Sequence, residues 1–204
     1  MRSCGLGRMQ RTVSNSGLAD RRGCDVRFMR LSWSGVMEST KRYCPYCGAS
    51  LGTKVEEGRQ RLYCNDEERF VYENPIPAST GLLLDEQGRI LLVLRNREPG
   101  LNKWALPGGF VENGESPVDA ARRELEEEAG VKVSEPSLID IIYQESEFYK
   151  TSLLIIGYHF TRFEGEIRAG DDAEEVQFFD RRRLPDLAFD SHRTLIDTYF
   201  EKTE

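Results

Sequence analysis

The sequence predicts an α/β sandwich. Short runs rich in Ile, Leu, Val and aromatic residues, which are typical of strands, recur between residues 80 and 179. Two segments, 117–129 and 191–201, place their apolar residues at helical spacing. A chain that alternates strands and helices in this way packs its helices onto a sheet, which defines the α/β class. A short cysteine-containing segment precedes this region and predicts a separate small β element.

Composition limits the classes of function. The chain has 204 residues, of which 39% are hydrophobic and 31% charged, as in soluble globular proteins. No apolar run approaches the roughly 20 residues that span a bilayer, so we expect no membrane partner. The net charge of −7 is uneven, because seven Arg and two Asp give residues 1–36 a charge of +5 and leave −12 for the rest. Such an acidic body argues against an extended nucleic acid as a partner.

Three regions follow one another along the chain. Residues 1–36 are rich in Arg, Ser and Gly and lack periodicity, so we expect a disordered extension, or a stretch upstream of a natural start at Met37. The alternative is a transit peptide, since such leaders are rich in Arg and poor in acids. Residues 40–72 form the cysteine-containing β element. Residues 75–204 are long enough for one well-buried domain.

Turn and strand signals give the order of elements in this domain. The two prolines of residues 72–77 break regular structure ahead of it. Apolar strands at 80–84 and 89–95 flank Asp-Glu-Gln-Gly, which predicts a hairpin. The remaining strand-like runs are 138–143, 152–163 and 175–179.

The two helices carry different signals. Ser116 is a good N-cap, Pro117 suits the first helical position, Asp119 can complete a capping box, and Gly130 is a natural end. The second helix, 191–201, is expected to be capped by Ser191 and to present an apolar face.

The first helix has an unusual charge pattern in its second half. Glu124, Glu127 and Glu128 are three and four residues apart, so their carboxylates crowd one face. Two of them also lie in the last turn, where the helix dipole disfavours negative charge. A divalent cation bound among them removes both objections. The pattern therefore predicts a metal site, with Arg123 placed one turn before Glu127 to pair with it.

The segment resembles the signature of the Nudix hydrolases. The positions that match it are Gly109, Glu115, Arg123, Glu124, Leu125, Glu127, Glu128, Gly130 and Val131. The resemblance implies an α/β/α sandwich with a mixed sheet and cleavage of a nucleoside diphosphate linked to another group, with Mg²⁺ or Mn²⁺. It also implies that Glu124, Glu127 and Glu128 bind the metal together with the carbonyl of Gly108. Glu115 would support this site.

Further residues are candidates for substrate binding and proton transfer. Arg95 and Arg97 could contact phosphate, and Gly109 lets the backbone approach the substrate closely. Candidates for base stacking are Phe148, Tyr149, Phe178 and Phe189. Candidates for the general base are Asp171, Asp172, Glu174, Glu175 and Glu124.

The substrate is suggested by the tail. Residues 184–192, Leu-Pro-Asp-Leu-Ala-Phe-Asp-Ser-His, resemble the ADP-ribose pyrophosphatase branch of the family. This implies hydrolysis of ADP-ribose to AMP and ribose 5-phosphate, and makes a homodimer plausible. Hydrolysis of NADH or another dinucleotide is the alternative, although the Ser-Gln-Pro-Trp-Pro-Phe-Pro element of NADH pyrophosphatases does not occur here. An alternative of another class is a catalytically silent nucleotide-binding or partner-docking module.

The cysteine-containing segment resembles the zinc ribbon that precedes some Nudix domains. Cys44 and Cys47 have the spacing of a zinc knuckle, and Cys64 follows at ribbon-like distance. Glu67 stands where the ribbon pattern has its fourth cysteine. The segment therefore holds Zn²⁺ through three thiolates with Glu67, or Asp66, as fourth ligand, or it is a metal-free remnant. We expect no disulfide, because the cysteine usage fits a reducing cytoplasm.

Overall fold

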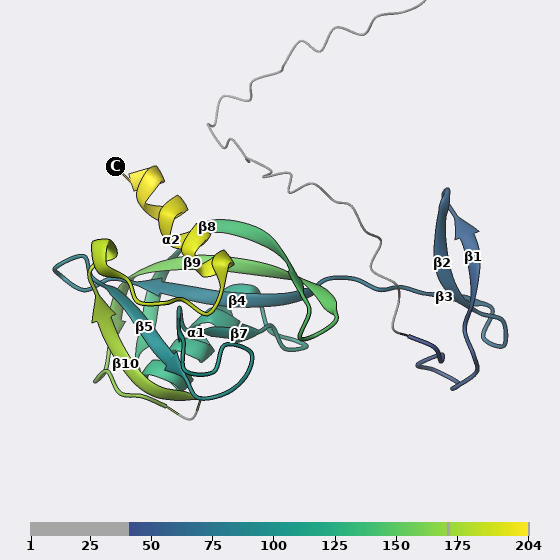
Figure 1. Ribbon diagram of the computed structural model, residues 1–204, viewed down its shortest axis with the longest axis horizontal. Coiled ribbons are helices and arrows are strands. Elements are labelled where there is room, and N and C mark those ends of the chain that lie inside the picture. The colour runs from purple at the N-terminus through teal and green to yellow at the C-terminus, as the bar shows by residue number, and fades with distance from the viewer. Residues whose placement is uncertain (1–40, 171, 204) are drawn as a thin grey trace, which may run out of the picture. The chain divides into compact units, whose positions relative to one another are not determined.

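The computed structural model describes residues 41–170 and 172–203 (Figure 1). The extension expected at 1–36 lies outside these residues. The cysteine-containing segment folds as a three-stranded antiparallel sheet, which we call the ribbon, with strands in the order β1 (Gly52–Glu56), β2 (Arg59–Cys64) and β3 (Arg69–Val71). Glu57 and Gly58 turn between β1 and β2 at positive φ, where glycine is favoured.

The catalytic region contains two further sheets. The smaller one has the order β10 (Ala173–Phe179), β5 (Ile90–Arg95) and β6 (Trp104–Ala105). The larger one has the order β7 (Gly108–Phe110), β4 (Ile76–Leu83), β9 (Thr151–Glu164) and β8 (Lys132–Ser146). Strands β4 and β9 run parallel while the other neighbours are antiparallel, so the larger sheet is mixed, as predicted.

Helices cover both faces of the larger sheet. Leu82 and Leu83 are consecutive on β4 and fully buried, so their side chains enter opposite faces. Leu82 belongs to a core cluster with Leu195 of α2 (Asp190–Thr203). Leu83 belongs to a second cluster with Leu125 of α1 (Pro117–Ala129). The predicted α/β/α arrangement is thereby confirmed.

Three expectations about local structure need correction. The turn at 85–88 forms, with Gly88 N–H donating to Asp85 O at 3.0 Å, but the hairpin does not extend beyond one bridge between Leu84 and Ile90. Strands β4 and β5 diverge because each pairs along its length with a strand of a different sheet, β4 with β9 and β5 with β10. Residues 76 and 77, expected in a linker, already belong to β4.

Ser191 does not cap the last helix. Helix α2 begins at Asp190. The Ser191 hydroxyl is buried and has no hydrogen-bond partner. Within the described residues, no helix has the length and apolar character needed to cross a membrane.

Candidate active site

Local sequence signals fix both ends of α1. Ser116 is extended, with φ −83° and ψ 155°, and its hydroxyl accepts the backbone N–H of Asp119 at 3.3 Å. Gly130 adopts the left-handed conformation at φ 74° and donates its N–H to Glu126 O at 3.1 Å. The predicted caps are confirmed, so the helix bounds and the direction of each glutamate follow from the sequence.

Two of the three glutamates are buried against the glycine pair that precedes the helix. Glu124 and Glu128 are only 8% and 3% exposed. Gly108 donates its backbone N–H to Glu128 Oε2 at 3.0 Å. A Cβ atom added to Gly109 would lie 2.2 Å from Glu124 Oε1, so only glycine leaves room for this carboxylate. Glu127, in contrast, is exposed on the outer side of the helix.

Glu124 and Glu128 are buried close together, and the positive charges around them only partly offset the negative charge of the two carboxylates. Burial is the main cause that raises the pKa of Glu128 to about 7, and the neighbouring Glu124 carboxylate contributes to this rise. Burial likewise raises the pKa of Glu124, although the Arg123 guanidinium opposes this rise. Carboxylate oxygens that are buried close together, and poorly stabilised as anions, are a fitting donor set for a divalent cation. The residues present therefore fit the metal that the family resemblance implies.

Arg123 joins the carboxylates of the site. Its Nη1 donates to Glu124 Oε1 at 2.7 Å and to Glu127 Oε2 at 2.9 Å. Its Nη2 donates to Glu115 Oε1 at 2.9 Å and to the Phe110 carbonyl at 3.0 Å. Hydrogen bonds from Arg123 lower the pKa of Glu115. The planar guanidinium thus holds α1 to the loop before it, which is a geometry that lysine cannot supply.

Two arginines reach the acidic pair from the end of β5. Arg95 donates from Nε to the Pro99 carbonyl at 2.7 Å, and its charge lowers the pKa of Glu128. The charge of Arg97 lowers the pKa of Glu124. Arg97 is largely exposed, so its guanidinium is accessible to an incoming phosphate.

The loop after β9 brings another acid to the site. Gly170 donates its N–H to Glu128 O at 3.1 Å, which docks this loop on the C-terminal end of α1. Asp172 forms an ion pair with Arg97, and its charge raises the pKa of Glu128. Of the other proton-transfer candidates, Glu174 and Glu175 lie exposed on β10, and Asp171 lies outside the described residues.

Exposed aromatic side chains lie beside the glycine pair. Phe110 is 38% exposed, and its ring centre lies 5.1 Å from that of Tyr149, which in turn lies 4.9 Å from Phe148. The sequence analysis named the last two residues but missed Phe110, although its place directly after Gly108 and Gly109 was a usable signal. The other two stacking candidates are placed differently: Phe178 packs against a core cluster, and Phe189 lies under the Arg95 guanidinium.

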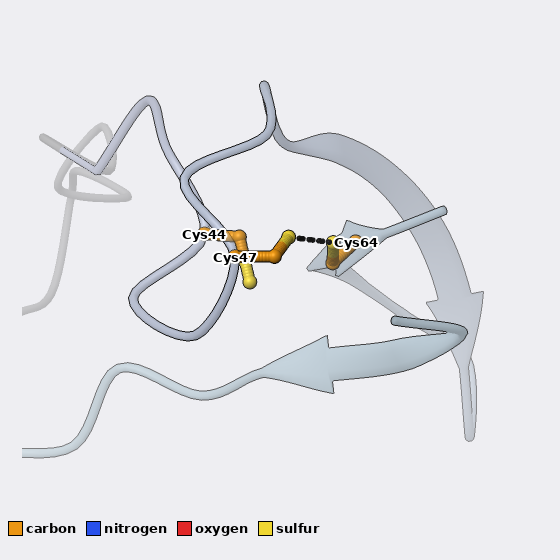
Figure 2. A group of neighbouring side chains, drawn as sticks. All are labelled: Cys44, Cys47 and Cys64. Atoms are coloured by element: carbon orange, nitrogen blue, oxygen red, sulfur yellow. Dashed lines mark hydrogen bonds between the residues drawn. The ribbon is translucent and has the colours of Figure 1, made fainter. Parts of the chain in front are cut away.

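The ribbon gathers three sulfur atoms (Figure 2). The Sγ atoms of Cys44, Cys47 and Cys64 all lie within 4.8 Å of one another, and those of Cys47 and Cys64 are 3.5 Å apart. All three are free cysteines. Among the described residues, the Glu67 carboxylate is not part of this cluster, but its backbone N–H donates to Cys64 Sγ at 3.4 Å.

The cluster stabilises a thiolate. Burial raises the pKa of Cys44, but backbone hydrogen bonds from Tyr46 and Cys47 outweigh this and hold it below its ordinary value. The Tyr46 N–H lies 3.5 Å from Cys44 Sγ. The Ala49 backbone hydrogen bond lowers the pKa of Cys47, but burial and the neighbouring Cys64 and Cys44 outweigh it and raise this pKa to about 11. Thiolates are the form in which cysteine binds metals, so Cys44 is the sulfur of this group that favours that form before a metal binds.

Fold and site together define an α/β/α sandwich in which a glycine loop and one helix present buried carboxylates for a divalent metal. The family model of the NUDIX domain matches residues 75–199. The chain belongs to the Nudix hydrolase family, whose members use divalent metals.

Individual relatives agree with this assignment. An "ADP-ribose pyrophosphatase" of Methanocaldococcus jannaschii is 37% identical over 129 residues, which cover 63% of this chain and 75% of that protein. An "NAD-capped RNA hydrolase ndx-9" of Caenorhabditis elegans is 28% identical over 161 residues, which cover 78% of this chain. The chain spans only 41% of the length of this second relative.

Solved structures share the fold. A NUDIX hydrolase from Nitrosomonas europaea aligns with a TM-score of 0.62 at 24% identity, covering 79% of this chain and 92% of that one. The NUDIX domain of Shewanella oneidensis NrtR, crystallised with ADP ribose, aligns with a TM-score of 0.58 at 21% identity, covering 70% of this chain and 94% of that one. At these identities the likeness supports the fold alone.

Proposed function

We propose that this protein is a Mg²⁺- or Mn²⁺-dependent pyrophosphohydrolase that cleaves ADP-ribose to AMP and ribose 5-phosphate. The observation that carries the proposal is the pair of buried carboxylates, Glu124 and Glu128, beside the glycine loop. Together with Glu127 and the Gly108 carbonyl they would hold the metal. When bound, the metal neutralises charge on the diphosphate and lowers the pKa of an attacking water.

The remaining residues bind the substrate and accept a proton. Water adds to one phosphorus, the bridging P–O bond breaks, and the proton released by the water passes to a carboxylate. We propose Asp172 or Glu124 as this carboxylate, since the charge of each acts on the pKa of Glu128. Arg95 and Arg97 would contact the phosphate oxygens, since both guanidinium charges already act on the acidic pair.

The adenine has an accessible aromatic surface to contact. Phe110, Tyr149 and Phe148 form a contiguous set of rings next to Gly109, and each is at least 38% exposed. Exposed aromatic rings beside a charged site suit a ligand with a flat base at one end and a diphosphate in the middle. The ADP-ribose pyrophosphatase relative supports the same substrate.

One observation favours a dinucleotide as the second candidate substrate. Alignments with relatives named NAD-capped RNA hydrolases cover up to 82% of this chain, which is more than residues 75–204 alone provide. The similarity therefore extends into the ribbon. A protein that shares the ribbon as well as the domain with these relatives could share their preference for a dinucleotide moiety.

A substrate panel tests these proposals. The full-length protein is incubated with Mg²⁺ or Mn²⁺ and ADP-ribose, NADH, a diadenosine polyphosphate or a nucleoside triphosphate, and the products are separated by chromatography. We expect AMP and ribose 5-phosphate to form fastest. Faster cleavage of NADH would favour the second candidate. Nucleotide binding without any cleavage would instead indicate a catalytically silent binding module.

We also propose that the ribbon holds structural Zn²⁺ through Cys44, Cys47 and Cys64, with Glu67 as the fourth ligand. The ribbon buries few apolar side chains, so a metal would supply much of its stability. Reduced thiols fit residence in the cytoplasm. Zinc content of the purified protein, compared with that of Cys47→Ser, tests this proposal, and an equal metal content in both would refute it.

A homodimer is proposed from one exposed surface. Strand β8 lies at the edge of the larger sheet and exposes Leu138, Ile141 and Tyr143, which are 55%, 51% and 47% accessible. A cluster of large apolar side chains on a sheet edge suits a second copy of the chain. Light scattering on the eluting protein should give twice the mass of one chain, and Ile141→Lys should shift it towards the monomer.

A further inference from the structure

A histidine that is distant from α1 in sequence contacts the segment leading into the glycine pair. His192 lies in the first turn of α2 and is only 7% exposed. Its Nδ1 accepts the backbone N–H of Leu106 at 3.1 Å. Leu106 begins the segment Leu-Pro-Gly-Gly, which ends at Gly109. Helix α2 therefore contacts the segment that carries the Gly108 carbonyl.

Three contacts fix this segment at two of its peptide groups. The first contact is the one between His192 and Leu106. The second is at the Pro107 carbonyl, which accepts the Thr80 hydroxyl at 2.7 Å. The third is at the Gly108 N–H, which donates to Glu128 Oε2 at 3.0 Å. Each peptide group is a rigid plane, so fixing the planes before Leu106 and before Gly108 leaves few torsions to set where the Gly108 carbonyl points.

The imidazole is suited to be a permanent acceptor. An acceptor Nδ1 carries no proton, so the neutral ring must carry its proton on Nε2. Burial, with a contribution from the charge of Arg95, lowers the pKa of His192 to about 3, so the ring stays neutral near pH 7. A side chain without an acceptor would leave the buried N–H of Leu106 unpaired, which costs about 1–3 kcal/mol and favours a shift of the loop.

The start of α2 is itself tied to the strand that leads into the segment. Ala188 donates its N–H to Trp104 O at 2.8 Å, and Trp104 donates its N–H to Asp186 O at 3.2 Å. The Phe189 ring packs edge-on against His192 with centres 5.0 Å apart. These contacts fix the position of the imidazole relative to β6. The imidazole can therefore hold the Leu106 end of the loop in place.

We propose that His192 is a positioning residue that fixes the Gly108 carbonyl for metal binding. The proposal rests on the metal site of the proposed function. Helix α2 would thereby take part in the metal site, although it supplies none of the carboxylates. The acceptor at Nδ1, rather than the bulk or polarity of the ring, performs this role.

Two variants of nearly equal polarity separate this role from simple packing. In His192→Asn the amide oxygen can occupy the place of Nδ1, whereas in His192→Gln it lies one bond farther and cannot. His159→Asn is the matched control, because this histidine is also partly buried and hydrogen-bonded, to the Tyr199 hydroxyl at 3.2 Å, but does not touch the loop. Mn²⁺ binding to the full-length proteins is measured without substrate from the free-ion EPR signal.

We expect His192→Gln to weaken Mn²⁺ binding at least about tenfold, while His192→Asn and His159→Asn stay within about threefold of the wild type. Under saturating Mn²⁺ the KM for ADP-ribose should change little. Equal Mn²⁺ affinity in all four proteins would overturn the positioning role and leave the proposed function intact. An equal loss in the Asn and Gln variants would show that packing, not the acceptor, matters. A wild type that binds no Mn²⁺ would overturn both proposals.

Discussion

Acid should destabilise the catalytic domain through His192. This ring has an ordinary pKa of 6.5 in the unfolded chain, and burial lowers its pKa to about 3 in the folded protein. Between these values the unfolded chain binds a proton that the folded protein excludes, so the free energy of unfolding falls as the pH falls. Each pH unit is worth about 1.4 kcal/mol, and the difference of about 3.5 units corresponds to roughly 5 kcal/mol in total. Below pH 3 no further loss arises from this group.

The assay compares wild type with His192→Asn, which lacks the titration and can keep the contact to Leu106. Urea unfolding at several pH values between 7.5 and 5 is followed by the fluorescence of Trp104, which packs against Phe179 with ring centres 4.6 Å apart. Carboxylates common to both proteins cancel in the difference. The stability of wild type relative to the variant should decline by about 2 kcal/mol between pH 6.5 and 5. A difference that stays constant over this range would refute the buried neutral imidazole.

Three further outcomes follow from the two sites. Glu128→Gln should lower hydrolysis at least about 100-fold. It should also raise the stability of the metal-free protein at pH 8 by roughly 3 kcal/mol, because burial raises the pKa of this carboxyl to about 7. Thermal unfolding with chelator measures this stability, and a destabilised variant would contradict the expectation. Arg123→Lys should reduce kcat by about 10- to 100-fold, since lysine cannot hold the carboxylates and the Phe110 carbonyl together; unchanged kcat would show that the network is dispensable. Glu67→Cys should tighten Zn²⁺ binding at least about tenfold in a chelator competition. Cys47→Ser is the control and should weaken binding. Weaker binding by Glu67→Cys would place residue 67 outside the site.

Helix α1 was predictable because its signals are local. A capping hydroxyl at Ser116, a proline one position later and a glycine at 130 act within one turn of the chain, so no distant contact is needed to define the bounds. The same regular geometry placed Glu124 and Glu128 on one stripe. Their spacing predicted that they share a face of the helix, but it could not reveal that the glycine pair would cover them.

The unpredicted features depend on contacts between distant segments. The hairpin signal at 85–88 does produce a turn. Whether β4 and β5 then pair with each other or join separate sheets depends on β9 and β10, which are more than 60 residues away in sequence. The contact of His192 with Leu106 spans 86 residues. No pattern within a short window of sequence contains such information, because periodicity reports which face is buried and not what buries it.

Glu127 is exposed whereas Glu124 and Glu128 are buried, so under the proposed function the three carboxylates would have different roles. Residues 124 and 128 are one turn apart and both face the glycine loop. Residue 127 is turned by about 60° from residue 124 and about 100° from residue 128, and its side chain is 55% exposed. The buried pair can hold a cation only in a fixed geometry. Glu127 is hydrogen-bonded to Arg123 at 2.9 Å and open to solvent. Under the proposed function, a carboxylate at that boundary would bind metal ions that arrive with the diphosphate, and the buried pair would fix the position at which cleavage occurs.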